Sequence, residues 1–213
     1  MTEVPVVHRD AHLAIVDKPR GTLVVPAPGR TGATLVDLLA RQFGQRVLAV
    51  HRLDEDTTGA LIVAFDESTL AALTELFRRH QVERHYLALL SAAPSPPAGR
   101  IAANLDESGD LVRVVPRGGR TAVTHYETVA RRGRCTLVRC RLETGRRNQI
   151  RVHFAALGCP LAGDRKYGYR QRPGERFPRV MLHSHRIRFV HPVTSSHLDF
   201  EVPPPEAELR VES

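Results

Sequence analysis

The densest group of reactive side chains lies in the segment 51–59, which reads HRLDEDTTG and precedes an apolar run at 60–65. We expect the carboxylate of Asp54, next to His51 and Arg52, to stay ionised, because a nearby cation favours the charged form. An ionised aspartate can act as a nucleophile or as a general base. The same residue types also form helix caps and tight turns, so this pattern alone leaves a purely structural role open.

A second group is basic and lies in the segment 143–153, which reads ETGRRNQIRVH. If a helix begins near Arg147, then Arg147 and Arg151 share one face of it, and the residues Ile150, Phe154 and Leu157 form its apolar stripe. The amides of such a helix start, with Arg146, Arg147 and Arg151, would form an anion site suited to phosphates. A solvated basic face fits the same spacing.

Tyr86 and three late histidines are weaker candidates. Tyr86 lies in the strand-like segment 82–88, where a tyrosine is usually part of a core or a sheet surface. Stacking on a base becomes attractive only beside a nucleic-acid site. His183 and His185 share one face of a probable strand, but neither a third ligand at a standard offset nor a paired glutamate accompanies them or His191, so we expect no metal site.

Strands are expected to dominate the elements that position these residues. The apolar patterns predict helices at 34–43, at 67–79 after an Asp66 cap, and at 147–157. They predict strands at 12–17, 60–65, 83–90, 111–115, 121–129, 135–142, 181–190 and 197–202, with regular structure ending at Pro203. Because helices do not alternate with strands, the patterns favour an α+β fold with a mixed or mostly antiparallel sheet. The Pro- and Ser-rich loop 91–99 is expected to separate two halves, at about 1–90 and 100–205, of a single domain covering residues 1–213.

Charge indicates a polyanionic partner. The chain has 213 residues and a net charge of +8, and only two of its 31 basic residues, Lys18 and Lys166, are lysines, so 29 are arginines. Guanidinium groups match phosphate oxygens in pairs and stack on bases, which favours nucleic acid over membrane. No apolar run reaches the length of a bilayer span, and acidic residues interrupt the N-terminal segment, so we expect neither a membrane helix nor a signal peptide. Three cysteines without a CxxC pair fit a reducing cytosol.

The segments together resemble the RluA-type RNA pseudouridine synthases. The loop 51–59 is similar to their HRLDxxTSG signature, with Thr58 at the serine position, and Asp17-Lys18-Pro19-x-Gly21 is similar to their NKPxG turn. The segment 84–88 resembles a KxYxA strand. The run 144–168 resembles GRTHQIRVH…GHPIxGDxxYG, and 182–192 resembles LHAxxL…HP. The order and spacing agree from about residue 8 to residue 202.

The resemblance implies the pseudouridine synthase fold, with two halves flanking a catalytic cleft, and a reaction without cofactor or metal. The N1–C1′ bond of a uridine in RNA is broken, the base is turned, and C5 is joined to C1′. Asp54 would be the essential carboxylate, attacking covalently or removing a sugar proton to give a glycal. Arg151 would pair with Asp54, and Tyr86 would stack on the base and help to move the C5 proton. The remaining assignments are substrate contacts: Arg52 holding the uridine out of its stack, Leu182 lining the uracil pocket, and His51, Arg146 and Arg147.

The partner implied is tRNA or large-subunit rRNA, bound by a cytoplasmic, monomeric protein that starts directly in the catalytic domain. Arg147-Asn148 departs from the commoner Thr-His and bears on RNA contacts or substrate choice. One alternative is a module of the same fold that binds RNA without catalysis. Another is a glycoside or nucleoside hydrolase using Asp54 with Glu55 or Asp56, although such enzymes need two carboxyl groups set apart across the scissile bond.

Overall fold

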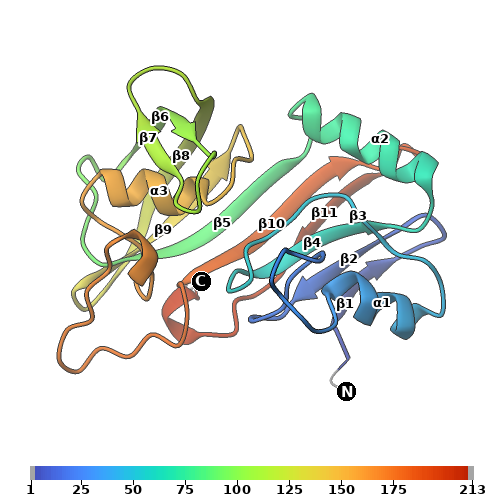
Figure 1. Cartoon of the computed structure of the whole chain (residues 1–213), viewed down its shortest axis with the longest axis horizontal. Helices are drawn as coiled ribbons and strands as arrows, with labels where there is room; N and C mark the ends of the chain where they lie inside the picture. The colour runs from blue at the N-terminus through green and yellow to red at the C-terminus, as the bar shows by residue number, and fades with distance from the viewer. Residues whose placement is uncertain (1–2, 211–213) are drawn as a thin grey trace. The chain divides into compact units, whose positions relative to one another are not determined.

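The computed structural model describes residues 3–210, with the exception of the Glu208 side chain, so the predicted domain of residues 1–213 extends past the described residues at both ends. The chain forms two compact units (Figure 1). Of the described residues, the first contains 3–84 together with 184–203, and the second contains 85–183 together with 204–210. Two strands, β5 (Glu83–Leu90) and β10 (Leu182–Val190), contain residues of both units.

This division differs from the expected halves at 1–90 and 100–205. The segment 91–99 lies inside the second unit and leads into a strand that begins at Ala98. The late strands β10 and β11 (His197–Glu201) belong mostly or entirely to the first unit, because β10 is the neighbour of an early strand in the sheet and β11 pairs with β10. Long-range strand pairing, not the composition break, therefore sets the boundary.

The sheet of the first unit brings the N-terminal strands beside β10. Its order is β1-β2-β4-β10, with β3 also paired to β4 and β11 to β10. The bounds of the early strands are β1 (Val6–Arg9), β2 (Leu13–Lys18), β3 (Leu48–Ala49) and β4 (Thr58–Ala64). β2 and β4 are antiparallel, with Lys18 opposite Gly59. The register therefore places the end of β2 against the loop that carries Asp54.

Both helices of the first unit begin where capping residues predict. In α1 (Leu35–Phe43), Thr34 and Asp37 form a reciprocal capping box, and Gly44 ends the helix in the left-handed conformation. In α2 (Glu67–Arg78), the Asp66 carboxylate accepts a hydrogen bond from the Thr69 amide at 2.8 Å. Side-chain caps satisfy amides that the first helical turn leaves without partners.

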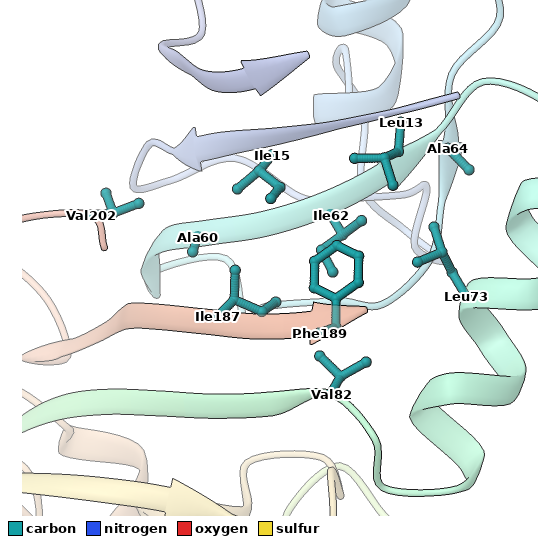
Figure 2. Close-up of a cluster of buried hydrophobic side chains, with 10 residues drawn as sticks. All are labelled: Leu13, Ile15, Ala60, Ile62, Ala64, Leu73, Val82, Ile187, Phe189 and Val202. Carbon is teal, nitrogen blue, oxygen red and sulfur yellow. The ribbon is translucent and has the colours of Figure 1, made fainter. Parts of the chain in front are cut away.

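One face of this sheet and one face of α2 bury a common apolar core, shown in Figure 2. Leu13 and Ile15 come from β2, and Ile62 comes from β4. Leu73 of α2 and Phe189 of β10 belong to the same cluster of ten residues in the close-up. Alternate strand residues face one side of a sheet, which is why this period-two pattern becomes one core.

The second unit contains the part of the sheet with the strand order β5-β9-β8-β6-β7, and the helix α3 (Gln149–Ala156). All of its described strand pairs are antiparallel. The remaining bounds are β6 (Ala98–Asp106), β7 (Arg113–Val115), β8 (Arg120–Arg132), β9 (Cys135–Leu142), and the short 3-10 helices η1 (Arg165–Tyr167) and η2 (Ala207–Leu209). η2 follows the point at which the prolines were expected to end regular structure.

Different residues cover the two faces of this part of the sheet. Tyr86 and Tyr126 both lie opposite Cys140, so all three share one face, and Phe154 of α3 packs on Tyr126 edge to face at 5.3 Å. Leu87 and Leu89 point to the other face, where they pack in a cluster with Cys135, Leu137, Ala162, Tyr169, Met181 and Leu209. The predicted α+β class with a mostly antiparallel sheet is confirmed. Among residues 3–210, the helices are all too short or too polar to cross a bilayer.

Candidate active site

A buried lysine organises the loop 51–59, called the Asp54 loop below. Lys18 is fully buried, and its Nζ donates hydrogen bonds to the carbonyl oxygens of Glu55 at 2.8 Å, Thr57 at 2.9 Å and Pro19 at 2.9 Å. An ammonium group has three donors, and these three carbonyls can use them all. The loop backbone just after Asp54 is therefore held at two points by one side chain.

The Asp54 loop turns tightly and then enters β4 beside another strand. The Thr57 amide donates to the Asp54 carbonyl at 3.0 Å, which closes a turn. Gly59 has φ of +106°, and a Cβ at this position would lie 2.2 Å from the Ser184 carbonyl oxygen. The motif glycine is therefore required both by its backbone conformation and by the close approach of β10.

His51 has partners inside the first unit, and its predicted contact with substrate stays a prediction. Its Nε2 accepts a hydrogen bond from the Ile62 amide at 3.0 Å, and its ring packs on Phe77 with centroids 4.7 Å apart. Burial, with a smaller effect from the Arg84 guanidinium, lowers the pKa of His51 to about 3. His51 is therefore neutral near pH 7 and cannot supply a cation beside Asp54. Arg52, in contrast, is exposed on the loop.

The basic segment departs from the expected helix at its start. α3 begins at Gln149, not at 147, and Asn148 before it has a left-handed backbone with φ of +53°. Arg147 consequently shares no helical face with Arg151. Leu157 follows the helix and is 46% exposed, so it is not part of the apolar stripe.

The first two arginines of this segment contact the backbone of neighbouring strands and loops. Arg147 Nη2 donates to the Glu107 carbonyl at 2.8 Å and to the Gly109 carbonyl. Arg146 Nε donates to the Thr121 carbonyl at 3.1 Å. These bonds orient both side chains in the second unit, and their predicted contacts with phosphate stay predictions.

Arg151 lies in a dense polar cluster. Its Nε and Nη2 donate to the two carboxylate oxygens of Asp164 at 2.7 and 2.8 Å, and its Nη1 donates to Asn148 Oδ1 at 3.0 Å. Its guanidinium also stacks 5.0 Å from the Tyr167 ring centre. Arg151 is 11% exposed and Asp164 is 1% exposed. Asn148, Asp164 and Tyr167, here called the Arg151 cluster, thus fix the guanidinium; its expected pairing with Asp54 stays a prediction.

The candidates are distributed over both units. His51, Arg52 and Asp54 share the Asp54 loop of the first unit. The second unit contains Tyr86, buried on β5, and Leu182, buried at the first position of β10. It also contains the three arginines at 146, 147 and 151.

Sequence reasoning about site residues missed the supporting polar groups. Lys18 was recognised as one of two lysines in the chain and as part of the NKPxG-like turn, but without a role, and these two features are the signals that could have found it. Gln149 is buried, and its Oε1 accepts from the Thr144 hydroxyl at 2.7 Å while its Nε2 donates to the Val123 carbonyl at 3.0 Å. Among the residues that the structure describes, no group of three or more His, Cys, Asp or Glu side chains could hold a metal ion.

Comparison with known proteins identifies the family. The family model described as RNA pseudouridylate synthase matches residues 12–156, a span that includes the whole Asp54 loop. The chain belongs to the RNA pseudouridylate synthase family. It is 38% identical to an uncharacterized RNA pseudouridine synthase, YlyB, of Bacillus subtilis, over 97% of this chain and 72% of that protein. It is 34% identical to ribosomal large subunit pseudouridine synthase D of Zymomonas mobilis, over 94% of this chain and 69% of that protein.

A solved structure agrees with this assignment to the RNA pseudouridylate synthases. The human protein titled RNA pseudouridylate synthase domain containing 4 superposes with a TM-score of 0.78 and 25% identity, over 98% of this chain and 94% of that chain. The pseudouridine synthase fold expected from the motifs is thereby confirmed, as is membership of an isomerase family whose substrate is RNA.

Proposed function

We propose that this chain isomerises uridine to pseudouridine in RNA, with Asp54 as the essential carboxylate. The observation that carries the proposal is the Asp54 loop itself, since Lys18 holds the backbone just after Asp54 and the Thr57 amide bonds the Asp54 carbonyl. Catalytic carboxylates must be held close to one geometry, and rigid support of this kind supplies it. The neighbouring Arg52 is exposed and available to RNA.

The proposed reaction breaks N1–C1′, rotates the uracil, forms C5–C1′ and transfers the C5 proton to solvent while N1 regains a proton. Asp54 acts either by covalent attack or by removing a sugar proton. Tyr86 stacks on the base and assists the loss of the C5 proton. Arg151, oriented by its cluster, pairs with Asp54 and keeps it ionised.

The remaining roles concern binding. Arg52 holds the uridine out of its stack, and the buried Leu182 lines the uracil pocket, where an apolar wall strengthens nearby charge interactions. Arg146 and Arg147 contact phosphates near the start of α3, while His51 supports the loop from within. No cofactor or metal takes part.

We propose large-subunit rRNA as the substrate, since several similar proteins are named ribosomal large subunit pseudouridine synthase D, and tRNA as the alternative. The protein acts as a monomer in the cytosol. In support of a reducing compartment, Cys135, Cys140 and Cys159 are all free and buried.

The test compares Asp54→Asn with Asp56→Asn, a matched carboxylate on the same loop. Release of tritium from RNA labelled at uracil C5 measures the reaction. We expect no release with Asp54→Asn, because the amide keeps the shape but not the charge, and near wild-type release with Asp56→Asn. Substantial release from the Asp54 variant would exclude Asp54 as the catalytic group.

The same assay distinguishes the other functions. Wild-type protein that binds RNA tightly without releasing tritium would indicate an inactive binding module, and free uracil would indicate a hydrolase. Carbodiimide-stop primer extension on RNA from cells with and without the gene then identifies the modified RNA. A stop that depends on the gene and lies only in tRNA would contradict the rRNA assignment.

A further inference from the structure

The second unit contains an arginine-lined cavity of about 760 Å³ that no role assigned above uses. One wall is the β8–β9 turn, which contributes Arg132 and Arg134. The other wall is the loop 172–177, part of the long orange loop after α3 in Figure 1. Apolar atoms of Leu89, Cys135 and Phe177 line the space between the walls. We call this cavity the arginine groove.

The charge of the arginine groove is strongly unbalanced. Four arginines line it, at positions 132, 134, 172 and 176, against the single carboxylate of Glu175. That carboxylate already accepts a hydrogen bond from the Tyr169 hydroxyl at 2.8 Å. Positive charges that lie close together without a counter-charge repel one another, which raises the free energy of the unbound protein. The same charges attract an anion.

Within residues 3–210, three of these guanidinium groups have no protein partner. Among the described residues, the side chains of Arg134, Arg172 and Arg176 form no hydrogen bond or ion pair. Arg132 differs, since its Nη2 donates to the Arg210 carbonyl at 2.9 Å. Some exposed arginines elsewhere in the chain are paired, among them Arg78 and Arg79 with Glu75, and Arg46 with Glu67. What distinguishes the groove arginines is that they line one cavity, where their N–H donors are available to the same ligand.

Strand register separates the groove from the candidate catalytic tyrosine. Leu89 follows Tyr86 by three residues on β5, so the two side chains point to opposite faces of the sheet. Three residues of strand span about 10 Å. A ligand in the groove therefore lies outside the pocket in which Tyr86 would stack on a base.

We propose that the arginine groove binds a segment of the substrate RNA away from the target uridine, through its phosphate groups; this rests on the proposed function. Guanidinium forks match phosphate oxygens in pairs. A basic channel with an aromatic side chain is the general form of a single-strand binding site, and Phe177 supplies the aromatic ring. Arginines on two facing walls suit a strand that passes between them.

The test uses two triple variants with the same loss of positive charge. The groove variant is Arg134→Gln, Arg172→Gln and Arg176→Gln. The control is Arg46→Gln, Arg78→Gln and Arg79→Gln, whose arginines are paired with glutamates in the first unit. Filter binding measures affinity for transcribed large-subunit rRNA and for a minimal stem-loop with the target uridine, over a range of salt concentrations. Unfolding midpoints confirm that both variants fold.

We expect the groove variant to bind the long RNA about tenfold or more weakly than the control variant. Its slope of log affinity against log salt should be smaller by about 2, from three lost phosphate contacts at roughly 0.7 each. Affinity for the stem-loop should differ little between the two variants. Equal long-RNA affinity and equal slope in the two variants would overturn the proposal.

A third probe, inorganic phosphate, tests whether the groove serves a small phosphorylated ligand instead. Phosphate that protects the groove from arginine-specific labelling, with no difference in RNA affinity between the variants, would also overturn it. Failure of the proposed function gives a separate result, namely no pseudouridine from wild-type protein on either RNA. If the wild-type protein forms pseudouridine but the groove and control variants bind RNA equally, only the groove proposal is overturned and the proposed function stands.

Discussion

Asp164 holds Arg151 by two parallel hydrogen bonds of 2.7 and 2.8 Å, in a setting where the carboxylate is almost completely buried. A similar bidentate pair joins Asp199 to Arg186 in the first unit, at 2.7 and 2.6 Å, but both of those side chains are more than one-third exposed. The same geometry is therefore present in one chain in a buried and in an exposed form. Only the buried form orients a residue of the candidate site.

Asp164→Asn is expected to destabilise the protein and to reduce pseudouridine formation. The amide cannot balance the Arg151 charge, and breaking a buried pair costs roughly 3 to 5 kcal/mol. The matched variant Asp199→Asn should cost about 0 to 1 kcal/mol, because water screens an exposed pair. Urea unfolding gives both free energies, and single-turnover rates at saturating enzyme give the activity. Equal effects of the two substitutions on stability and rate would mean that burial of Asp164 has no special role.

Local patterns predicted most of the regular elements, because they depend on residues close in sequence. Asp66 and Thr34 cap the helices as expected, and β5 and β9 have the predicted bounds. β6 was missed because its residues are mostly half-exposed or exposed, so the strand has only a weak apolar signal. The start of α3 was misplaced because the left-handed Asn148 interrupts a run of good helix formers.

Local sequence patterns could not predict long-range contacts, even for motif residues that were recognised. Nothing in the spacing of the loop 51–59 shows that His51 accepts a hydrogen bond from Ile62 and loses its charge by burial. Likewise, Asp164 was recognised only as part of the GDxxYG motif, and nothing in that motif indicates that it pairs with Arg151. Motif resemblance gives residue types, whereas tertiary packing decides their partners and charge.

Lys18→Met should loosen the Asp54 loop. The substitution leaves the carbonyl oxygens of Glu55 and Thr57 without their donor, and each unsatisfied buried group costs about 1 to 3 kcal/mol. Part of that loss is offset, because the buried ammonium is itself costly to desolvate. We therefore expect a net loss of roughly 2 kcal/mol, with a lower turnover number rather than a weaker RNA affinity.

The control for this prediction is the other lysine. Lys166 donates to the Asp110 carbonyl from an exposed position, so Lys166→Met should change stability by less than about 0.5 kcal/mol. Chemical denaturation and steady-state kinetics on the two variants make the comparison. A Lys18→Met protein with wild-type turnover would show that the loop keeps its geometry without the ammonium group.

Gly59→Ala should be far more damaging than Gly44→Ala. Both glycines have positive φ, which costs a residue with a Cβ about 1 kcal/mol. Only at Gly59 would the new methyl also collide with backbone, 2.2 Å from the Ser184 carbonyl oxygen, whereas nothing lies within 4 Å at Gly44. We expect Gly44→Ala to fold with a slightly lower melting temperature and Gly59→Ala to be recovered mainly as insoluble protein. Similar melting temperatures for the two would contradict the close approach of β4 and β10.

The buried imidazole of His153 should make stability depend on pH. Burial lowers the pKa of His153 on α3 to about 4, while its Nδ1 lies 3.0 Å from the Thr124 hydroxyl. The unfolded chain takes up this proton below about pH 6.5, but the folded protein does so only near pH 4. Stability is therefore full above pH 6.5 and falls as the pH is lowered through this window, by up to about 1.4 kcal/mol per pH unit for one histidine.

His153→Asn should remove this contribution and make the pH dependence between pH 6.5 and pH 5 less steep, while the buried His51 keeps its own contribution. The matched variant His197→Asn, at an exposed position of β11, should keep the wild-type slope. Urea unfolding at several pH values in this range gives the slope for each protein. A slope for His153→Asn equal to that of wild type would mean that His153 is protonated in the folded state, and that its burial in the second unit carries no electrostatic cost.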